Sequence, residues 1–285
     1  MAAQVQPFFH ADSNTWSYLV SDPGTKAALL IDPVLDYEPR AARIGTSAAQ
    51  ALLAEADAHG LDLRWVLETH AHADHLSAAA WLRGQRPGLR VGIGERIRAV
   101  QAHFGPVFEL APGECAACFD QLFADGDRLA LGALQIEVLA TPGHTPDGVS
   151  YLIGDALFVG DSLFLPDAGT GRCDFPGGSA SALFRSIQRL YALPDETRVF
   201  VGHDYGPNGR APACESRIGE QKRGNLHARE GVDEAGFVAM REARDATLPL
   251  PALILPSLQV NLRAGELPAP QANGRRYLRL PLDAF

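Results

Sequence analysis

The sequence predicts an α/β protein built from two β-sheets that pack together, with helices on the outside. Strand-like and helix-like segments alternate along the first third of the chain, and the middle is rich in short strands joined by turns. No glycine-rich phosphate loop or dinucleotide fingerprint follows a predicted strand, which disfavours a doubly wound sheet. With 285 residues, 46% of them hydrophobic, the chain can form one large domain with a sizeable core.

The first third of the chain is predicted to alternate strands with helices. Short apolar runs bounded by turn residues predict the strands, and helical spacing predicts the helices. The expected strands are Thr15 to Val20, Ala27 to Ile31, Leu63 to Glu68 and Leu89 to Ile93, and the expected helices are Ala48 to Ala58, Leu76 to Leu82 and about Glu95 to Phe104. Ser47 is expected to cap the first helix and Gly60 to end it.

The remainder is predicted to pass from a strand-rich middle to a helical end. The expected strands are Leu134 to Leu139, Gly148 to Ile153, Ala156 to Val159 and Val199 to Val201, and the expected helices are Ala180 to Tyr191, Cys214 to Gly224 and Asp233 to Asp245. A proline-rich tail follows from Pro249 to Pro281. We expect a single domain over residues 1–285, with a core of about 5–210 and an extension of about 211–285 packed on it.

Charge and hydropathy argue against several functional classes. The net charge is −9 and the basic residues are scattered, whereas nucleic-acid binding uses clustered Lys and Arg. No apolar run approaches the roughly 20 residues of a membrane helix, and residues 1–10 lack the features of a signal peptide. We therefore expect a cytoplasmic protein. The sequence identifies no subunit interface; a homodimer is the commonest assembly of soluble enzymes.

The four cysteines do not predict a disulfide framework. They are few and widely spaced, at Cys115, Cys118, Cys173 and Cys214. Cys115 and Cys118 form a lone C-x-x-C motif without the second pair that a zinc ribbon requires. We interpret them as incidental thiols.

A histidine-rich segment predicts a metal site. Thr69-His70-Ala71-His72-Ala73-Asp74-His75 places three imidazoles and a carboxylate directly after a predicted strand. Neutral imidazole and carboxylate are the usual ligands of divalent metals. Residues two apart in an extended or turning backbone point the same way, so His70 and His72 can converge on one point. Asp74 and His75 are expected in the first turn of the following helix and can face an adjacent point.

Three later turns offer further ligands, each directly after a predicted strand. They are Thr141-Pro142-Gly143-His144-Thr145, Gly160-Asp161-Ser162 and Gly202-His203-Asp204. Loops at strand ends are positioned by the scaffold and can converge. Taken singly, each ligand-type residue would be structural; together with the histidine-rich segment they predict one metal centre. The other histidines, which are His10, His59, His103 and His227, are expected at the surface or in packing positions.

The order of these motifs resembles the metallo-β-lactamase superfamily, and the resemblance spans most of the chain. A closer resemblance is to the persulfide dioxygenase (sulfur dioxygenase) branch and its bacterial β-lactamase-like members. The segments that carry it are Leu30-Ile31-Asp32-Pro33-Val34, Thr69 to His75, Gly160-Asp161-Ser162-Leu163-Phe164, Gly171-Arg172-Cys173-Asp174-Phe175, His203-Asp204-Tyr205, Gly219-Glu220-Gln221 with Asn225, and Gln259-Val260-Asn261-Leu262-Arg263. The resemblance implies an αββα sandwich with its metal between the inner strand edges.

One segment departs from the dioxygenase pattern. Many members read G-C-G-R-T-D-F where this chain has Gly169 to Phe175. Cys173 thus replaces a threonine and Thr170 replaces a cysteine, so any role of a thiol at the latter position is absent here.

The resemblance leaves two metal arrangements open. Hydrolases of the superfamily bind two metals, which are zinc or a mixed pair. One set of ligands would be His70, His72 and His144, the other Asp74, His75 and His203, with Asp161 bridging. Such a centre polarises a thioester carbonyl, as in glyoxalase II, which cleaves a glutathione thioester.

Persulfide dioxygenases instead bind one iron(II) per chain. Carried over residue by residue, the ligands are His70, His144 and Asp161, which leave positions for a substrate sulfur and O₂. His72, Asp74, His75 and His203 would then surround this centre as supporting residues. The implied partners are glutathione persulfide and O₂, and the products are sulfite and glutathione. We favour this alternative because the segments at Asp32 and Arg172 fit the dioxygenase pattern. A non-catalytic metal-binding fold is a third alternative, which the complete ligand set disfavours.

The resemblance also suggests substrate-binding residues. Glutathione carries two carboxylates, so cationic and phenolic groups near the metal are natural candidates. They are Arg172, which would support the site through Asp174, and Tyr205, Arg217, Arg223, Asn225 and Arg263. Each of them also fits an alternative interpretation as a solvated helix or tail residue.

Overall fold

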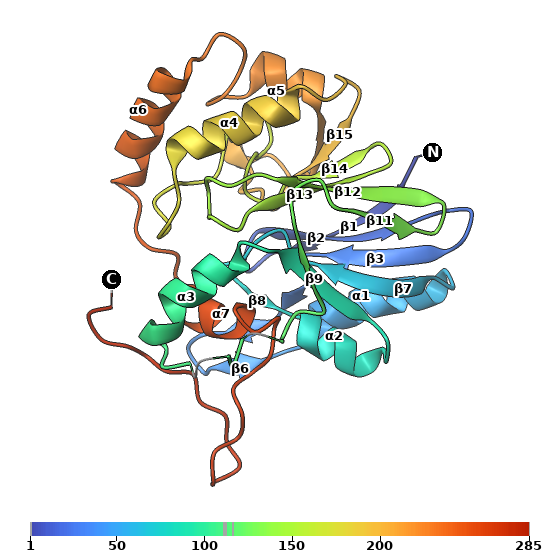
Figure 1. Cartoon of the computed structure of the whole chain (residues 1–285), viewed down its shortest axis with the longest axis vertical. Helices are drawn as coiled ribbons and strands as arrows, with labels where there is room; N and C mark the ends of the chain where they lie inside the picture. Colours follow the sequence, from blue (N-terminus) through green and yellow to red (C-terminus); the bar gives the residue numbers. More distant parts are fainter. Residues whose placement is uncertain (1, 111–112, 116, 285) are drawn as a thin grey trace.

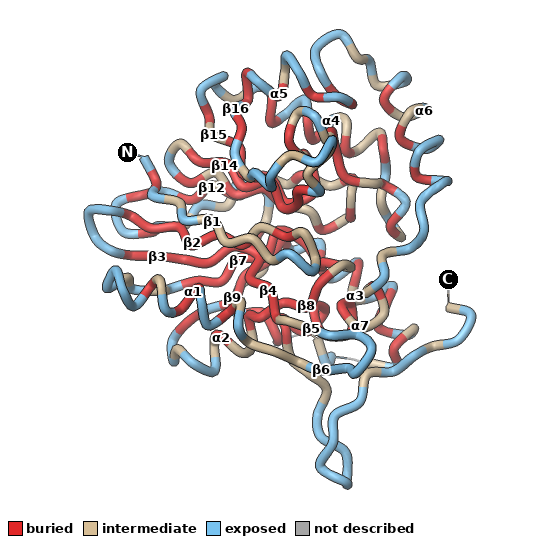
Figure 2. The backbone as a smooth tube through the Cα atoms, turned by 180° about the vertical axis from the view of Figure 1, so that it is seen from behind, coloured by how far each residue is buried: buried red, intermediate tan, exposed pale blue. Residues whose placement is uncertain are grey.

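Two six-stranded sheets lie face to face between two layers of helices in the computed structural model, which describes residues 2–110, 113–115 and 117–284 (Figure 1). This confirms the predicted αββα sandwich. Buried residues concentrate in the strands and along the inner faces of the helices, and exposed residues follow the loops and the C-terminal segment (Figure 2).

The first sheet is formed by the N-terminal part of the chain. Its strands, in spatial order, are β1 (Gln4–His10), β2 (Thr15–Ser21), β3 (Ala27–Ile31), β7 (Asp62–Leu67), β9 (Arg90–Gly94) and β10 (Gln121–Phe123). The last four run parallel, and all residues of β3 are buried, as expected of a strand covered on both faces. The edge strand β1 is mostly half-buried and lacks the continuous apolar run that predicted the others.

The second sheet is mostly antiparallel. Its strands, in order, are β11 (Arg128–Leu131), β12 (Leu134–Ala140), β13 (Val149–Ile153), β14 (Ala156–Phe158), β15 (Arg198–Phe200) and β16 (Glu215–Arg217). Only β14 and β15 pair in parallel. Two small ribbons complete the β-structure, β4 (Val34–Leu35) with β8 (Leu76–Ser77) and β5 (Tyr37–Glu38) with β6 (Arg43–Ile44).

The helices divide between the two outer faces (Figure 1). The first sheet is covered by α1 (Ser47–Ala58), α2 (Ala79–Gln85), α3 (Ile97–Val107) and α7 (Ile254–Asn261), and the second by α4 (Ala180–Tyr191), α5 (Ile218–Gly224) and α6 (Glu234–Asp245). In α4, the Ser179 side chain caps the helix by accepting from the N–H of Ala182 at 3.2 Å, while Leu183, Ile187 and Leu190 are fully buried. The C-terminal extension therefore contributes α7 to the layer on the first sheet and both α5 and α6 to the layer on the second.

Four details differ from the sequence-based expectation. Leu76 and Ser77 form β8 with a partner strand, so the helix begins only at Ala79, and Asp74 and His75 lie in a bend rather than in a helical turn. The first residues of the helix expected over 214–224 form β16, because they pair with β15. The tail contains α7. In each case a tertiary partner overrides the local pattern.

The cap of α1 also differs from expectation. Ser47 is the first helical residue, and its side chain makes no capping bond. The carboxylate of Asp36 instead accepts from the backbone N–H of Ser47 at 2.6 Å. Gly60 does follow the helix with a positive φ of 61°, as predicted. None of the described helices is long and apolar enough to cross a membrane.

Candidate metal centre

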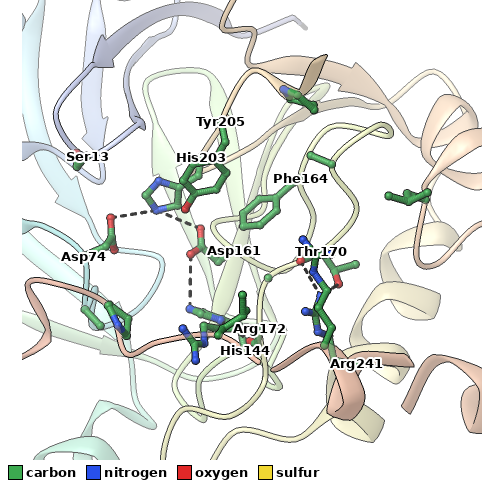
Figure 3. Close-up of a pocket in the computed structure, with 18 of the residues that line it drawn as sticks. Ser13, Asp74, His144, Asp161, Phe164, Thr170, Arg172, His203, Tyr205 and Arg241 are labelled. Atoms are coloured by element: carbon green, nitrogen blue, oxygen red, sulfur yellow. Dashed lines mark hydrogen bonds and ion pairs between the residues drawn. The ribbon is translucent and has the colours of Figure 1, made fainter. Parts of the chain in front are cut away.

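Four loops that follow central strands bring all the predicted ligands together. Donor atoms of His70, His144 and Asp161 lie within 4.8 Å of one another, and so do those of a second group, which is His72, Asp74, His75 and His203. Asp161 stands between the groups (Figure 3): its Oδ2 lies 3.5 Å from Nε2 of His144, and its Oδ1 lies 3.5 Å from Nε2 of His203.

The protein holds one nitrogen of each outer imidazole and leaves the other free. Nδ1 of His144 lies 2.6 Å from the carbonyl oxygen of Arg172, and Nδ1 of His203 lies 3.1 Å from that of Asn14. An N–H bonded in this way fixes the tautomer, so that Nε2 presents its lone pair to the centre.

The histidine-rich loop is fastened from behind by buried polar side chains. Oδ1 of Asp32 accepts from the N–H of Thr69 at 2.7 Å and lies 3.1 Å from Nε2 of His72. The side-chain amide of Asn261, on α7, donates to the carbonyl oxygens of His72 and His75, each at 2.8 Å. The loop therefore depends on β3 and on the C-terminal extension for its shape.

His70 and Asp74 have ionisation states that suit metal ligation, whereas neighbouring carboxylates, against the effect of burial, raise the pKa of His72 and that of His203. Burial holds the pKa of His70 well below its usual value, so this imidazole is neutral, as a ligand must be. Burial alone would raise the pKa of Asp74, but the imidazoles of His203 and His75 hold it well below its usual value, so Asp74 stays ionised.

Unpaired buried atoms show that these residues fit a metal. Nδ1 of His72, Nε2 of His75 and Oδ1 of Asp161 are buried and have no hydrogen-bond partner among the described residues. Such atoms cost free energy unless a ligand or ion satisfies them. A cation held by the first group would satisfy Oδ1 of Asp161, and one held by the second group would satisfy the atoms of His72 and His75.

A cavity of about 800 Å³ opens beside the centre. His144, Asp161 and His203 lie at one side, next to the rings of Phe164 and Tyr205 (Figure 3). The ring of Tyr205 stacks on that of His203, with centroids 5.9 Å apart. The opposite wall comes from the C-terminal extension and consists of Leu226, Arg241, Arg244, Leu248, Pro251, Ala252 and Leu253.

The structure brings two of the six expected substrate-binding residues to this cavity, Arg172 and Tyr205. Arg172 is bound to Asp174 by two N–O pairs at 2.5 and 2.6 Å, and its carbonyl oxygen holds His144. The Arg172–Asp174 pair is thus present, but the contact with His144 comes from the backbone of Arg172 and not through Asp174. Tyr205 is 60% exposed.

The other four expected residues do not line the cavity. Arg217 pairs with Glu196 at 3.0 Å, and Arg263 is buried and pairs with Glu114 at 2.8 Å. Arg223 is exposed on α5. Asn225 is buried, and its amide donates to the carbonyl oxygen of Gly169 at 3.0 Å, which supports the loop beneath the cavity. These residue types are suited to binding a substrate anion, but in the fold their side chains contact other protein groups or solvent.

The cysteines show no sign of activation. Burial raises the pKa of Cys173 to about 12 and that of Cys115 to about 11, so both thiols stay protonated near neutral pH. Cys115 and Cys118 are free thiols in the structure.

Sequence reasoning missed several residues that shape the site. The carboxylate of Asp147 accepts from the N–H of Ala71 at 2.8 Å, and Asp32 and Asn261 hold the rest of the loop. The role of Asp32 could have been predicted, because Asp32 directly follows a buried strand. The same kind of position, shortly after a strand, identified Asp161 as a candidate ligand. Arg241 and Arg244 lie in a helix with no local sign that they face a cavity.

A family model described as the metallo-beta-lactamase superfamily matches residues 11–203, which include all four ligand loops. The chain belongs to the metallo-β-lactamase superfamily. It is 50% identical to a probable metallo-hydrolase of Burkholderia pseudomallei, with 99% of each chain covered. It is 43% identical to glyoxylase B2 of Dictyostelium discoideum, with 99% of this chain and 97% of that one covered.

Relatives of this superfamily member include persulfide dioxygenases. It is 33% identical to the human mitochondrial persulfide dioxygenase ETHE1 over 70% of its own length and 68% of that protein. Its structure resembles the crystal structure of ETHE1 from Myxococcus xanthus, with a TM-score of 0.74, 34% identity, and 92% and 100% of the two chains covered. A 30% identical structure, described as a di-iron-bound form, matches with a TM-score of 0.56 over 78% of this chain and 99% of that one.

Proposed function

We propose that this chain is a non-haem iron(II) persulfide dioxygenase, which converts glutathione persulfide, O₂ and water to glutathione and sulfite. The observation that carries the proposal is the separate donor group of His70, His144 and Asp161 at the edge of the cavity. Two imidazoles and one carboxylate are the ligand set of non-haem iron oxygenases, with positions left open for substrate and O₂. Similarity to two persulfide dioxygenase-type proteins, at 33% and 34% identity, supports it.

The second group of donors has a supporting role in this proposal. The Oδ2 atom of Asp74 lies 3.1 Å from Nδ1 of His75 and 3.3 Å from Nε2 of His203, so its charge is compensated within the protein. When bound, iron(II) supplies the redox chemistry that O₂ requires and that zinc lacks. Of this group, His203 borders the proposed iron ligand Asp161, with Nε2 of His203 3.5 Å from Oδ1 of Asp161.

The remaining residues define where substrate enters. Phe164 and Tyr205 place aromatic rings beside His203, and their apolar faces limit the water around the reacting sulfur. The backbone of Arg172 keeps Nε2 of His144 pointed at the centre. Substrate therefore reaches the donor group from the side of the C-terminal extension.

A second candidate function is supported by Asp161 itself. Its Oδ1 atom is unpaired and faces His203, which is the position of a carboxylate that bridges two metals. With zinc or a mixed pair of metals, the same residues would suit a hydrolase of glutathione thioesters, and the relative named glyoxylase B2 favours this alternative.

Metal content and substrate consumption separate the two functions. Protein purified without air should contain about one iron per chain and consume O₂ when glutathione persulfide is added. Two metals per chain, with thiol release from S-lactoylglutathione and no O₂ uptake, would establish the hydrolase instead.

A further inference from the structure

Three arginines line the cavity beside the metal centre, and two of them are already paired. Arg172 is bound to Asp174 through both sides of its guanidinium. Arg241 is almost completely buried and is bound to Asp245 at 2.7 and 3.0 Å. Their positive charges are therefore neutralised by the protein itself.

Arg244 differs from both. It is exposed on the last turn of α6, and its guanidinium makes no hydrogen bond or ion pair with any described residue. A cation near a helix C-terminus is favoured by the helix dipole, but the dipole does not require the side chain to face a cavity. Arg244 lines this one, next to Leu248.

Four acidic residues line the cavity, Asp12, Asp74, Asp161 and Asp167, and none of them is paired with Arg244. Asp167 is bound by Arg210 at 2.7 and 2.8 Å. Asp74 and Asp161 face the histidines of the centre. An anionic group that enters the cavity can therefore meet the unpaired guanidinium of Arg244, which lines the same cavity as His144 and Asp161.

We propose that Arg244 binds a carboxylate of the thiol substrate and thereby selects low-molecular-weight thiols that carry one. This inference rests on the proposed function, because it takes the reacting sulfur to lie at His144 and Asp161. A guanidinium binds a carboxylate through two parallel hydrogen bonds, and the adjoining apolar wall of Leu248, Pro251 and Leu253 strengthens such a pair by lowering the local dielectric.

Because Arg244 lies in α6, the proposed selection of substrates depends on the C-terminal extension. Arg244 lies outside residues 11–203, which the superfamily model matches. In this proposal, the residues that hold the metal and the residue that selects the substrate therefore belong to different parts of the chain.

Glutathione binding tests the proposal without turnover. The iron-loaded protein is titrated with glutathione under nitrogen, as wild type, Arg244→Ala, Arg244→Lys and Arg229→Ala, the last being an exposed arginine that does not line the cavity. Arg244→Ala should weaken binding about 10- to 100-fold, Arg244→Lys should restore part of the loss, and Arg229→Ala should match wild type. Equal binding by wild type and Arg244→Ala, equal losses at Arg244 and Arg229, or no binding by wild type would each overturn the proposal.

A blocked ligand identifies the group that is bound. The diethyl ester of glutathione lacks free carboxylates, so wild type should bind it as weakly as Arg244→Ala binds glutathione, and Arg244→Ala should weaken it no further. If Arg244→Ala bound the ester more weakly than wild type does, Arg244 would act on a group other than a carboxylate, which contradicts the proposal. Thermal unfolding of Arg244→Ala should be unchanged, because the side chain has no partner to lose.

Kinetics keep this inference separate from the proposed function. With glutathione persulfide, Arg244→Ala should raise KM about 10- to 100-fold and leave kcat within about twofold. O₂ uptake that is unaffected by the substitution would retain the dioxygenase and reject the role of Arg244. If glutathione binding depends on Arg244 but the protein shows no O₂ uptake, the role of Arg244 in carboxylate binding is retained and the dioxygenase function is rejected.

Discussion

Oδ1 of Asp32 lies 3.1 Å from Nε2 of His72, and both side chains are buried. The same carboxylate accepts from the backbone N–H and the hydroxyl of Thr69, at 2.7 and 2.8 Å. Asp32 thus joins the end of β3 to the histidine-rich loop. The Thr69 hydroxyl in turn lies 3.0 Å from Nδ1 of His70, so Asp32 supports a proposed ligand through one intermediate side chain.

Asp32→Asn should weaken metal binding about 10- to 100-fold, because Asp32 holds the hydroxyl of Thr69 beside Nδ1 of His70, and the substitution removes its charge while it keeps its shape. Asparagine also tolerates the left-handed backbone of this position, where φ is 48°. Competition with a metal-binding dye measures the affinity. Asp57→Asn, on the exposed face of α1, is the control and should bind metal as wild type does. An unchanged affinity in Asp32→Asn would show that Asp32 only shapes the backbone.

Asp161→Ala should abolish bound metal and activity together, since Asp161 supplies the carboxylate of the proposed iron site. The loss of affinity should exceed the roughly 10- to 100-fold that a supporting residue costs. Metal analysis after gel filtration measures it, with circular dichroism to verify the fold. Full metal occupancy in this variant would remove Asp161 from the ligands.

Gly171→Ala should displace the same ligand without changing any polar group. A Cβ at this position would collide with the carbonyl oxygen of Asp161 and come within 3.2 Å of Nδ1 of His144. We expect most of the bound metal to be lost. The matched control is Gly84→Ala in α2, where a Cβ meets nothing within 4 Å; it should keep the metal and stabilise the fold by about 0.5–1 kcal/mol. Equal metal content in both variants would contradict the close packing at Gly171.

His227 should make stability depend on pH below neutrality. It is buried, and its Nδ1 accepts from the N–H of Thr170 at 3.0 Å, so the ring is neutral. Burial, together with the charge of Arg241, lowers its pKa from 6.5 to about 4. As pH falls from 6.5 to 4, the unfolded chain takes up a proton that the folded chain resists, so folded stability decreases.

His227→Gln keeps an acceptor for Thr170 and removes this titration. Urea unfolding at pH 7.5, 6, 5 and 4.5 should show a smaller decrease in stability for the variant than for wild type. All other titratable groups are shared by the two proteins, so the difference between the two isolates His227. Parallel curves for the two proteins would mean that His227 is not held neutral.

The prediction from sequence succeeded where the signal was local. β2, β3, β7 and β12 were predicted because each is a short apolar run, and α4 because its buried residues repeat at helical spacing. It failed at Leu76, where a strand partner decides the structure, and at Ser47, whose place as the cap is taken by Asp36. Neither partner is visible in the local pattern.

The chain by itself determined the layered fold and identified the candidate ligands, since apolar periodicity and donor residues after strands can be recognised in short stretches of residues. Only the tertiary structure decided what surrounds those donors. Arg217 and Arg263 turn to Glu196 and Glu114, whereas Arg241 and Arg244 reach the cavity. The physical reason is that a charged side chain takes the partner that the folded backbone brings within a few ångströms, and such distances between remote segments exist only after folding.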